Sequence, residues 1–169
     1  MIEAVGWEWF DSYFRHCSEL LTPTGLFFLQ AIVITDRAYE IEKRTRSFAN
    51  QVIFPGGCLP SVQSIQTSIA EVTDLRTVAL EDISSSYVLT LRAWRDRFEA
   101  ATDRLEELGY DERFRRIWAF YLTISEAGFA ETRIRDVQIL FAKPGWSGPP
   151  DFDAAGAASE RGSIDLAES

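Results

Sequence analysis

The sequence predicts an α/β fold whose sheet is incomplete. Three short segments have the apolar or alternating pattern of strands. The segments between them repeat apolar residues at three- and four-residue spacing, which is typical of helices. The resulting order is helix, strand, helix, strand, two helices and strand, and such alternation is characteristic of α/β proteins. A sheet of only three strands leaves a long edge unpaired, so we expect it to be part of a wider sheet.

The first part of the chain predicts a helix, a buried strand and a charged helix. Residues 7–21 carry Trp7, Phe10, Cys17 and Leu21 at helical spacing, and residues 22–25 form a turn. Residues 26–34 are a short apolar run rich in Ile and Val, which favours a strand buried on both faces. Residues 36–52 are charged and are expected to form a surface helix.

The second part predicts three helices and two strands. A helix is expected to open at residues 60–61 and to run to residue 72, with Ile65 and Ile69 facing inward. Residues 75–83 alternate in polarity as a strand does. Apolar stripes predict amphipathic helices at 91–108, closed by Gly109, and at 114–125. Residues 137–142 form the last predicted strand.

Composition indicates one folded domain followed by a tail. The chain has 169 residues, 46% of them apolar and 13% aromatic, which suffices for one packed core. A net charge of −9 argues against nucleic acid as a partner and gives no support to a broad basic membrane face, although a local basic patch is compatible with it. Residues 146–169 are acidic and rich in Gly, Ala, Ser and Pro, so we expect a disordered acidic tail after a domain of residues 1–145.

The sequence also indicates a reducing compartment. Cys17 and Cys58 lack the spacing of a disulfide framework, and no secretory signal opens the chain. The longest apolar run, residues 26–34, is far shorter than the ~20 residues that span a bilayer. We therefore expect a cytoplasmic protein, with room for peripheral contact at the inner face of the membrane. One histidine and two distant cysteines predict no metal site.

Residues 52–61, Val-Ile-Phe-Pro-Gly-Gly-Cys-Leu-Pro-Ser, form an unusual loop. Its prolines fix φ and remove amide donors, whereas Gly56 and Gly57 permit turns or close approach of the backbone. The remaining residues are mostly apolar, so the loop is expected to fold over an apolar cavity or a neighbouring layer. The segment resembles a signature loop of the cyclopropane-fatty-acyl-phospholipid synthase and mycolic acid cyclopropane synthase family.

Further motifs carry the same resemblance in the family's order. They are Met-Ile-Glu-Ala-Val-Gly at 1–6, Leu-Gln-Ala-Ile at 29–32, Ser-Tyr-Val-Leu-Thr-Leu-Arg-Ala-Trp-Arg at 86–95, Glu-Ala-Gly-Phe at 126–129 and Val-Gln-Ile at 137–139. The resemblance implies the C-terminal half of a Rossmann-like class I methyltransferase fold, with strands five to seven and their helices. It also implies S-adenosylmethionine as cofactor.

The cofactor's glycine-rich strand, turn and helix are expected upstream of Met1, because the chain has no Gly-x-Gly pattern. The chain thus contains no expected cofactor-binding residue. Met1 is then an internal methionine read as a start, or the start of a split or decayed gene.

The resemblance further implies a bicarbonate base held by Glu3, Gln30, the backbone of Ile32, and Tyr87. Each side chain also has a structural interpretation. Glu3 favours a helix dipole, Gln30 is a satisfied core amide, and Tyr87 packs on the sheet ahead of the following helix. The chain has Ala4 where family members often have histidine, and Gln30 where some have histidine.

The resemblance implies an acyl channel lined by Phe54, Leu59, Leu91, Tyr121 and Ser125, although apolar stripes of this kind also form ordinary cores. The substrate implied is an unsaturated phospholipid acyl chain. Its lipid class, the product (cyclopropane, methyl or methylene) and the oligomeric state are left open. The alternative is a non-catalytic remnant, a lipid- or partner-binding domain without the cofactor site.

Overall fold

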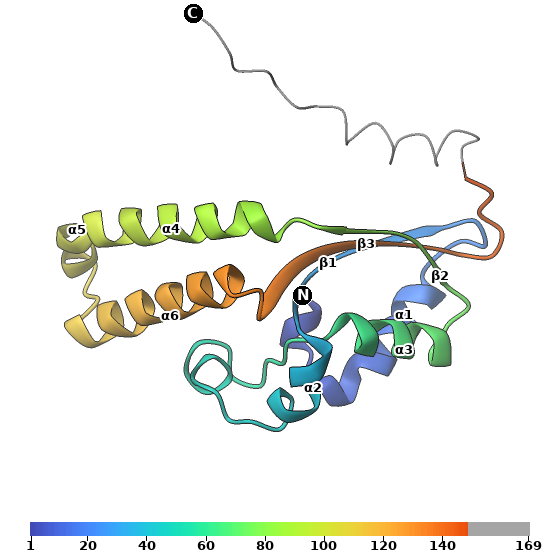
Figure 1. Ribbon diagram of the computed structural model, residues 1–169, viewed down its shortest axis with the longest axis horizontal. Helices are drawn as coiled ribbons and strands as arrows, with labels where there is room; N and C mark the ends of the chain where they lie inside the picture. The colour runs from blue at the N-terminus through green and yellow to red at the C-terminus, as the bar shows by residue number, and fades with distance from the viewer. Residues whose placement is uncertain (149–169) are drawn as a thin grey trace, which may run out of the picture.

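In the computed structural model, residues 1–148 are described, and they build a three-stranded sheet with helices (Figure 1). The elements before the midpoint are η1 (Ile2–Ala4), η2 (Trp7–Trp9), α1 (Phe10–Glu19), β1 (Leu26–Ile34), α2 (Asp36–Glu42), the π-helical η3 (Ala49–Ile53) and α3 (Val62–Val72). They are followed by β2 (Arg76–Asp82), α4 (Ser84–Ala100), α5 (Thr102–Glu107), α6 (Glu112–Ala130) and β3 (Ile134–Ala142). The predicted order of helices and strands is confirmed.

The last strand lies in the centre of the sheet. The strand order is β1-β3-β2, and β3 runs antiparallel to both neighbours. This register sets Gln30 opposite Gln138 and Ile32 opposite Asp136. A bulge in β2 between Thr77 and Ala79 interrupts the regular alternation that the sequence predicts for this strand.

One face of the sheet is covered by α1 and α3, and this layer is the main core. Figure 1 shows α1 and α3 on the same side of the sheet. Phe10 and Phe14 of α1 and Ile65 and Ile69 of α3 belong to one core with residues of β1 and β3. The helix α3 begins where the sequence predicts, because the side chains of Ser61 and Ser64 form a capping box. The buried residues of β1 and β3 in this core are Leu29, Ala31, Val33, Ile34, Val137, Ile139 and Phe141.

The hairpin formed by α4, α5 and α6 extends away from the sheet (Figure 1). Its two long helices pack through Leu91, Leu122 and Phe129. The carboxylate of Glu126 on α6 also forms ion pairs with Arg92 at 3.1 Å and with Arg95 at 2.6 Å, both on α4. The hairpin is therefore a second packed unit, next to the end of the sheet where Ile32 lies.

Two predicted helices have different bounds in the structure. The helix predicted at 36–52 ends at Glu42 and resumes only as η3. Asn50 of η3 donates from its Nδ2 to the carbonyl of Thr45, which lies between the two helices, at 2.8 Å, so a side chain takes a backbone acceptor that a continuous helix would use. The helix predicted at 91–108 begins at Ser84 and breaks at Ala101, so Tyr87 lies in its first turn rather than before it.

The other face of the sheet is partly bare within the described residues. Phe28 and Leu26 of β1 point to this face and are 58% and 43% exposed. The strand β1 is at the edge, and no strand among residues 1–148 pairs with its outer side. This is the incomplete sheet that the sequence predicts.

The described part of the chain extends slightly beyond the predicted domain boundary at residue 145. The Trp146 carbonyl accepts from the Arg76 guanidinium at 3.1 Å, and the same guanidinium lies over the Trp146 ring. The predicted tail otherwise lies outside the described residues. No helix within residues 1–148 has the length and apolar character needed to cross a bilayer.

Candidate functional site

Glu3 connects the start of the chain to the edge of the sheet. Its Oε1 accepts from the backbone amide of Ile32 at 2.7 Å, on the open edge of β1, and its Oε2 accepts from the amino group of Met1 at 2.7 Å. The neighbouring Ile2 is completely buried and anchors this turn. Glu3 therefore binds an outward-facing backbone donor of β1, and the structure brings the predicted residues Glu3 and Ile32 together.

The loop at 52–61 holds the backbone of Glu3 in place. The Cys58 amide donates to the Glu3 carbonyl at 2.7 Å. A Cβ on Gly57 would lie 3.0 Å from the Phe54 carbonyl oxygen and 3.2 Å from the Glu3 carbonyl oxygen. Glycine at this position is thus required by the close approach of two backbone segments, which is one of the two uses predicted for it.

Gln30 is fixed by two side chains of β3. Its Nε2 donates to Oδ2 of Asp136 at 2.8 Å, and its Oε1 accepts from Nε2 of Gln138 at 3.4 Å. The side chain itself is exposed rather than buried, because it lies on the open face of the sheet. The expected partners of its amide are therefore present, but they surround it at a surface rather than in the core.

Asp136 is a site residue that the sequence reasoning missed. It is 1% exposed, and its Oδ1 has no hydrogen-bond partner among the described residues. Burial raises the pKa of its carboxyl group, the hydrogen bond from Gln30 opposes this shift, and the charges of Glu3 and Asp82 raise the pKa further. A carboxylate directly before the apolar run of β3 was the available signal.

Tyr87 faces the same corner from α4. Its ring stacks on Phe129 at 4.7 Å and meets Trp94 edge-on at 6.1 Å. Burial raises the pKa of its hydroxyl, with further contributions from the charges of Asp136, Tyr121 and Glu3. The structure thus places Glu3, Asp136 and Tyr87 in one electrostatic environment, next to Ile32.

An apolar cavity of about 300 Å³ opens beside Glu3. Phe54, Leu59 and Tyr121, which are three of the five predicted acyl-channel residues, line it. The other lining residues are Met1, Glu3, Ala4, Ile32, Glu42, Ser47, Ala49, Asn50, Gly57 and Cys58. The cavity therefore joins the predicted polar corner to a mostly apolar space.

The remaining two predicted channel residues, Leu91 and Ser125, are not among the residues that line this cavity. Leu91 is 1% exposed and belongs to the packing between α4 and α6. Burial raises the pKa of the Tyr121 hydroxyl, and the nearby Ser125 side chain partly opposes this rise. Phe54 and Tyr121 meet edge-to-face at 5.6 Å, and both also line a second hollow between α4 and α6.

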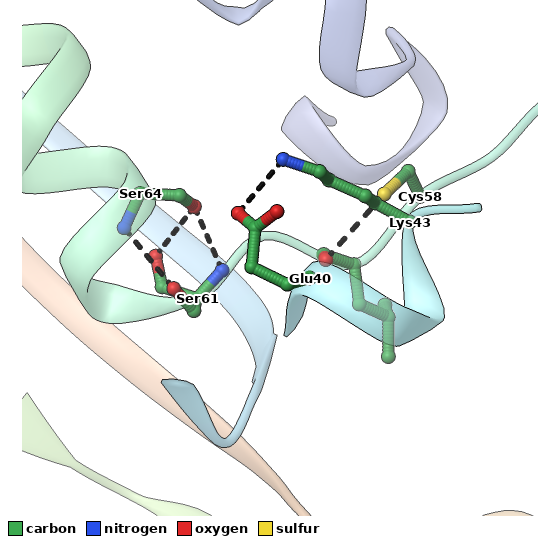
Figure 2. Close-up of polar contacts among 6 residues, drawn as sticks. Glu40, Lys43, Cys58, Ser61 and Ser64 are labelled. Carbon is green, nitrogen blue, oxygen red and sulfur yellow. Dashed lines mark hydrogen bonds and ion pairs between the residues drawn. The ribbon is translucent and has the colours of Figure 1, made fainter. Parts of the chain in front are cut away.

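Cys58 is not activated as a nucleophile. Burial raises the pKa of its thiol to about 11, with smaller contributions from Glu8 and Glu42 that Lys43 opposes. Figure 2 shows the surroundings: the Cys58 thiol donates to the Leu59 carbonyl at 3.6 Å, and Lys43 pairs with Glu40 at 2.8 Å. In residues 1–148, no group of three His, Cys, Asp or Glu side chains is arranged to hold a metal ion.

Comparison with protein families identifies close relatives of this chain. The family model "Mycolic acid cyclopropane synthetase" matches residues 1–139. Tuberculostearic acid methyltransferase UfaA1 of Mycobacterium tuberculosis is 41% identical over 129 residues, which cover 76% of this chain and 30% of that protein. The cyclopropane-fatty-acyl-phospholipid synthase of Escherichia coli K12 is 34% identical over 146 residues, which cover 85% of this chain and 36% of that protein. The chain thus spans about a third of the length of these relatives.

Solved structures share the fold. The cyclopropane synthase MmaA2 of Mycobacterium tuberculosis has a TM-score of 0.74 at 20% identity, and the mycolic acid cyclopropane synthase CmaA1, complexed with SAH and CTAB, has 0.74 at 24%. Each match covers 83% of this chain and 52% of the solved chain. This similarity confirms the predicted fold class, part of a Rossmann-like methyltransferase fold with an incomplete sheet.

Proposed function

This chain belongs to the mycolic acid cyclopropane synthetase family, and from that membership we propose that it is the C-terminal part of an S-adenosylmethionine-dependent lipid methyltransferase. The proposed substrate is the double bond of an unsaturated phospholipid acyl chain. One observation carries the proposal. The corner formed by Glu3 and the Ile32 amide, beside Gln30 and Tyr87, borders an apolar cavity of about 300 Å³, and we propose that this cavity receives part of the acyl chain.

The residues of this chain suit a reaction that passes through a cation. Methylation of an alkene leaves a positive charge on the substrate. The carboxylate of Glu3 and the aromatic faces of Phe54 and Tyr121 border the same cavity, and groups of both kinds stabilise a cation. The apolar walls also exclude water, which would otherwise add to the cation.

The same corner has the hydrogen-bonding groups that suit bicarbonate. The Ile32 amide lies on the open strand edge, where an anion would replace Glu3 as its acceptor. Gln30 Nε2 has a second N–H besides the one that it donates to Asp136, and the Tyr87 hydroxyl makes no hydrogen bond within residues 1–148. We propose that these three donors, with Glu3 as an acceptor, hold the anion. The chemistry that bicarbonate supplies when bound is removal of a proton from the new methyl group. Ala4 supplies no cationic contact, so the anion would be held by the neutral donors of Ile32, Gln30 and Tyr87.

The cofactor's main contacts are proposed to lie outside this chain. The sequence has no Gly-x-Gly turn, and the described residues therefore do not provide the usual cradle for S-adenosylmethionine. The matched relatives are about three times longer than the matched region, and we propose that the missing contacts belong to their additional part.

A chimera tests the proposed function. We would join residues 1–148 to the preceding part of the Escherichia coli synthase and measure transfer of a labelled methyl group to unsaturated phospholipid. We expect incorporation of label, and the lipid product will distinguish a cyclopropane from a methyl or methylene group. A chimera that folds and binds both cofactor and lipid, but transfers no label, would overturn the proposal.

A second candidate function is a lipid- or partner-binding domain without catalysis. The bare sheet face with Phe28 and Leu26 and the open edge of β1 favour this alternative, because both need a covering partner. It predicts that the chain binds unsaturated lipid or a second polypeptide, whereas the chimera remains inactive.

A further inference from the structure

Another hollow, distinct from the one between α4 and α6, lies beside the apolar cavity. It has a volume of about 730 Å³ and lies between the segment at 43–54 and the first half of α6. Phe48 and Phe120 join these two elements through an edge-to-face contact at 4.9 Å, and Phe120 is 52% exposed. We call this feature the basic hollow, and its lining residues are Phe48, Glu112, Arg113, Arg116, Ile117, Ala119 and Phe120.

The basic hollow carries positive charge that the described residues do not neutralise. Arg113 and Arg116 are exposed, and neither forms an ion pair within residues 1–148. By contrast, Arg115 of the same helix turn is paired with Glu106 at 2.6 Å. Among the described lining residues Glu112 is the one acid, and it lies in the first turn of α6, where its charge favours the helix dipole.

The facing segment adds two more arginines. Arg44 and Arg46 follow α2, are exposed and have no ion-pair partner among the described residues. Lys43, which precedes them, is already paired with Glu40. A chain with a net charge of −9 therefore has two arginines in the lining of the hollow and two more within four residues of Phe48, on the segment that contacts α6. None of the four has an ion-pair partner among residues 1–148.

The basic hollow and the apolar cavity are built from adjacent residues of the same two segments. Phe48 lines the hollow, whereas its neighbours Ser47 and Ala49 line the cavity. On α6, Phe120 lines the hollow and Tyr121 lines the cavity. Figure 1 shows the segment between α2 and α3 near α6, and the ring contacts of Phe48 with Phe120 and of Phe54 with Tyr121 join the two.

We propose that the basic hollow is the surface by which this protein docks on an anionic phospholipid membrane. The arginines contact lipid phosphates, and the exposed Phe120 enters the interfacial region. A lipid tail then has a short path into the cavity that Tyr121 lines. Basic side chains next to exposed aromatic rings are the combination that favours anionic membrane surfaces. This inference rests on the proposed function, because it takes the cavity to receive an acyl chain.

Vesicle binding of the 169-residue protein tests this surface. We would measure cosedimentation with vesicles of phosphatidylcholine alone and of phosphatidylcholine mixed with phosphatidylglycerol. We expect binding to the anionic vesicles, weakened by salt because surface charge is screened. The double substitution Arg113→Gln and Arg116→Gln should weaken binding by about 25-fold, at about 5-fold for each arginine near an anionic surface.

The matched control is the double substitution Arg15→Gln and Arg37→Gln. These arginines are also exposed and without an ion pair in residues 1–148, but they lie on α1 and α2. The control removes the same charge and should leave vesicle binding near the parental value. The substitutions Arg44→Gln and Arg46→Gln, on the facing segment, should reproduce the loss independently of α6.

Three results would overturn the docking surface. They are equal binding by the parent and both hollow variants, an equal loss in the control, or binding to an acidic protein without binding to anionic vesicles. The assay needs neither cofactor nor methyl transfer. An inactive chimera with intact, arginine-dependent vesicle binding would therefore overturn the proposed function and leave the docking surface standing.

Discussion

The proposed bicarbonate site depends most on two groups, the carboxylate of Glu3 and the hydroxyl of Tyr87. In the chimera, Glu3→Gln and Tyr87→Phe should each lower kcat and leave the binding of cofactor and lipid nearly unchanged, because the base acts on charge that develops during the reaction. Positioned acid–base groups contribute ~10²–10⁴-fold, and losing one of several ligands should cost part of that. Gln30→Ala should have a smaller effect.

Steady-state kcat and KM, measured with and without added bicarbonate, check this prediction. The variants should depend on added bicarbonate more than the parent does. The control variants Glu19→Gln and Tyr110→Phe change the same chemical groups away from the corner and should retain parental kcat. Unchanged kcat in both Glu3→Gln and Tyr87→Phe would return these residues to a structural role.

Asp136 makes the stability of the protein depend on pH. Its pKa is raised in the folded state, so the folded protein holds this proton more tightly than the unfolded chain does. The stability of the parent therefore falls as pH rises from the ordinary carboxyl value through the raised pKa. Asp136→Asn removes this charge and retains an acceptor for Gln30.

Melting temperatures of Asp136→Asn and of the parent, measured at several pH values from about 4 to 7, check the prediction. The melting temperature of Asp136→Asn should increase relative to that of the parent as pH rises. Asp136→Ala serves as the control, because it also removes the charge but loses the contact with Gln30 and should melt lower than Asp136→Asn throughout. A difference that does not change with pH would show that Asp136 does not titrate in this range.

The Pro-Gly-Gly loop is the element that positions Glu3. Gly57→Ala places a Cβ 3.0 Å from the Phe54 carbonyl oxygen, and overpacking of this kind costs about 1–3 kcal/mol. We expect a melting temperature lower by several degrees, at about 2–4 °C per kcal/mol. Because Glu3 and Gly57 touch through their backbones, the amide signal of Ile32 in an NMR spectrum should also shift.

Gly56→Ala is the control for this loop. Gly56 has φ of 83°, so alanine there is strained, but its Cβ would meet no atom within 4 Å. Stability should fall, whereas the Ile32 amide signal should stay in place. Equal shifts in both variants would show that the loop does not hold Glu3 specifically.

The sequence predicts some of these elements correctly and others wrongly. The bounds of the strand at 26–34 and of the helix ending at residue 72 are correct, because a continuous apolar run and a serine cap are local signals. The prediction that this strand is buried on both faces was wrong, since Leu26, Phe28 and Gln30 are exposed on one face within the described residues. The charged segment at 36–52 was wrong as one helix, because the contact of Asn50 with the Thr45 carbonyl replaces a helical hydrogen bond. The start of α4 was missed because Asp82, in the preceding strand, accepts from the Ser84 amide at 3.0 Å.

At the scale of the whole molecule, the missing glycine turn predicts weak cofactor binding. Isolated residues 1–169 should bind S-adenosylmethionine weakly or not at all, whereas the chimera should bind it. Isothermal titration calorimetry on both proteins checks this expectation. Micromolar affinity of the isolated chain would contradict it and would mean that residues of this chain form the cofactor site alone.

The sequence by itself determined the order of the elements, the family resemblance and the candidates Glu3, Gln30, Ile32 and Tyr87. These follow from periodicity and motifs, which depend on residues close together in the chain. The tertiary structure decided that β3 lies between β1 and β2, that Asp136 holds Gln30, and that Arg113 and Arg116 line a hollow with Phe48 and Phe120. Gln30 and Asp136 are 106 positions apart, and only the strand register brings them to 2.8 Å. Such contacts depend on how the elements pack, and local sequence patterns do not specify that packing.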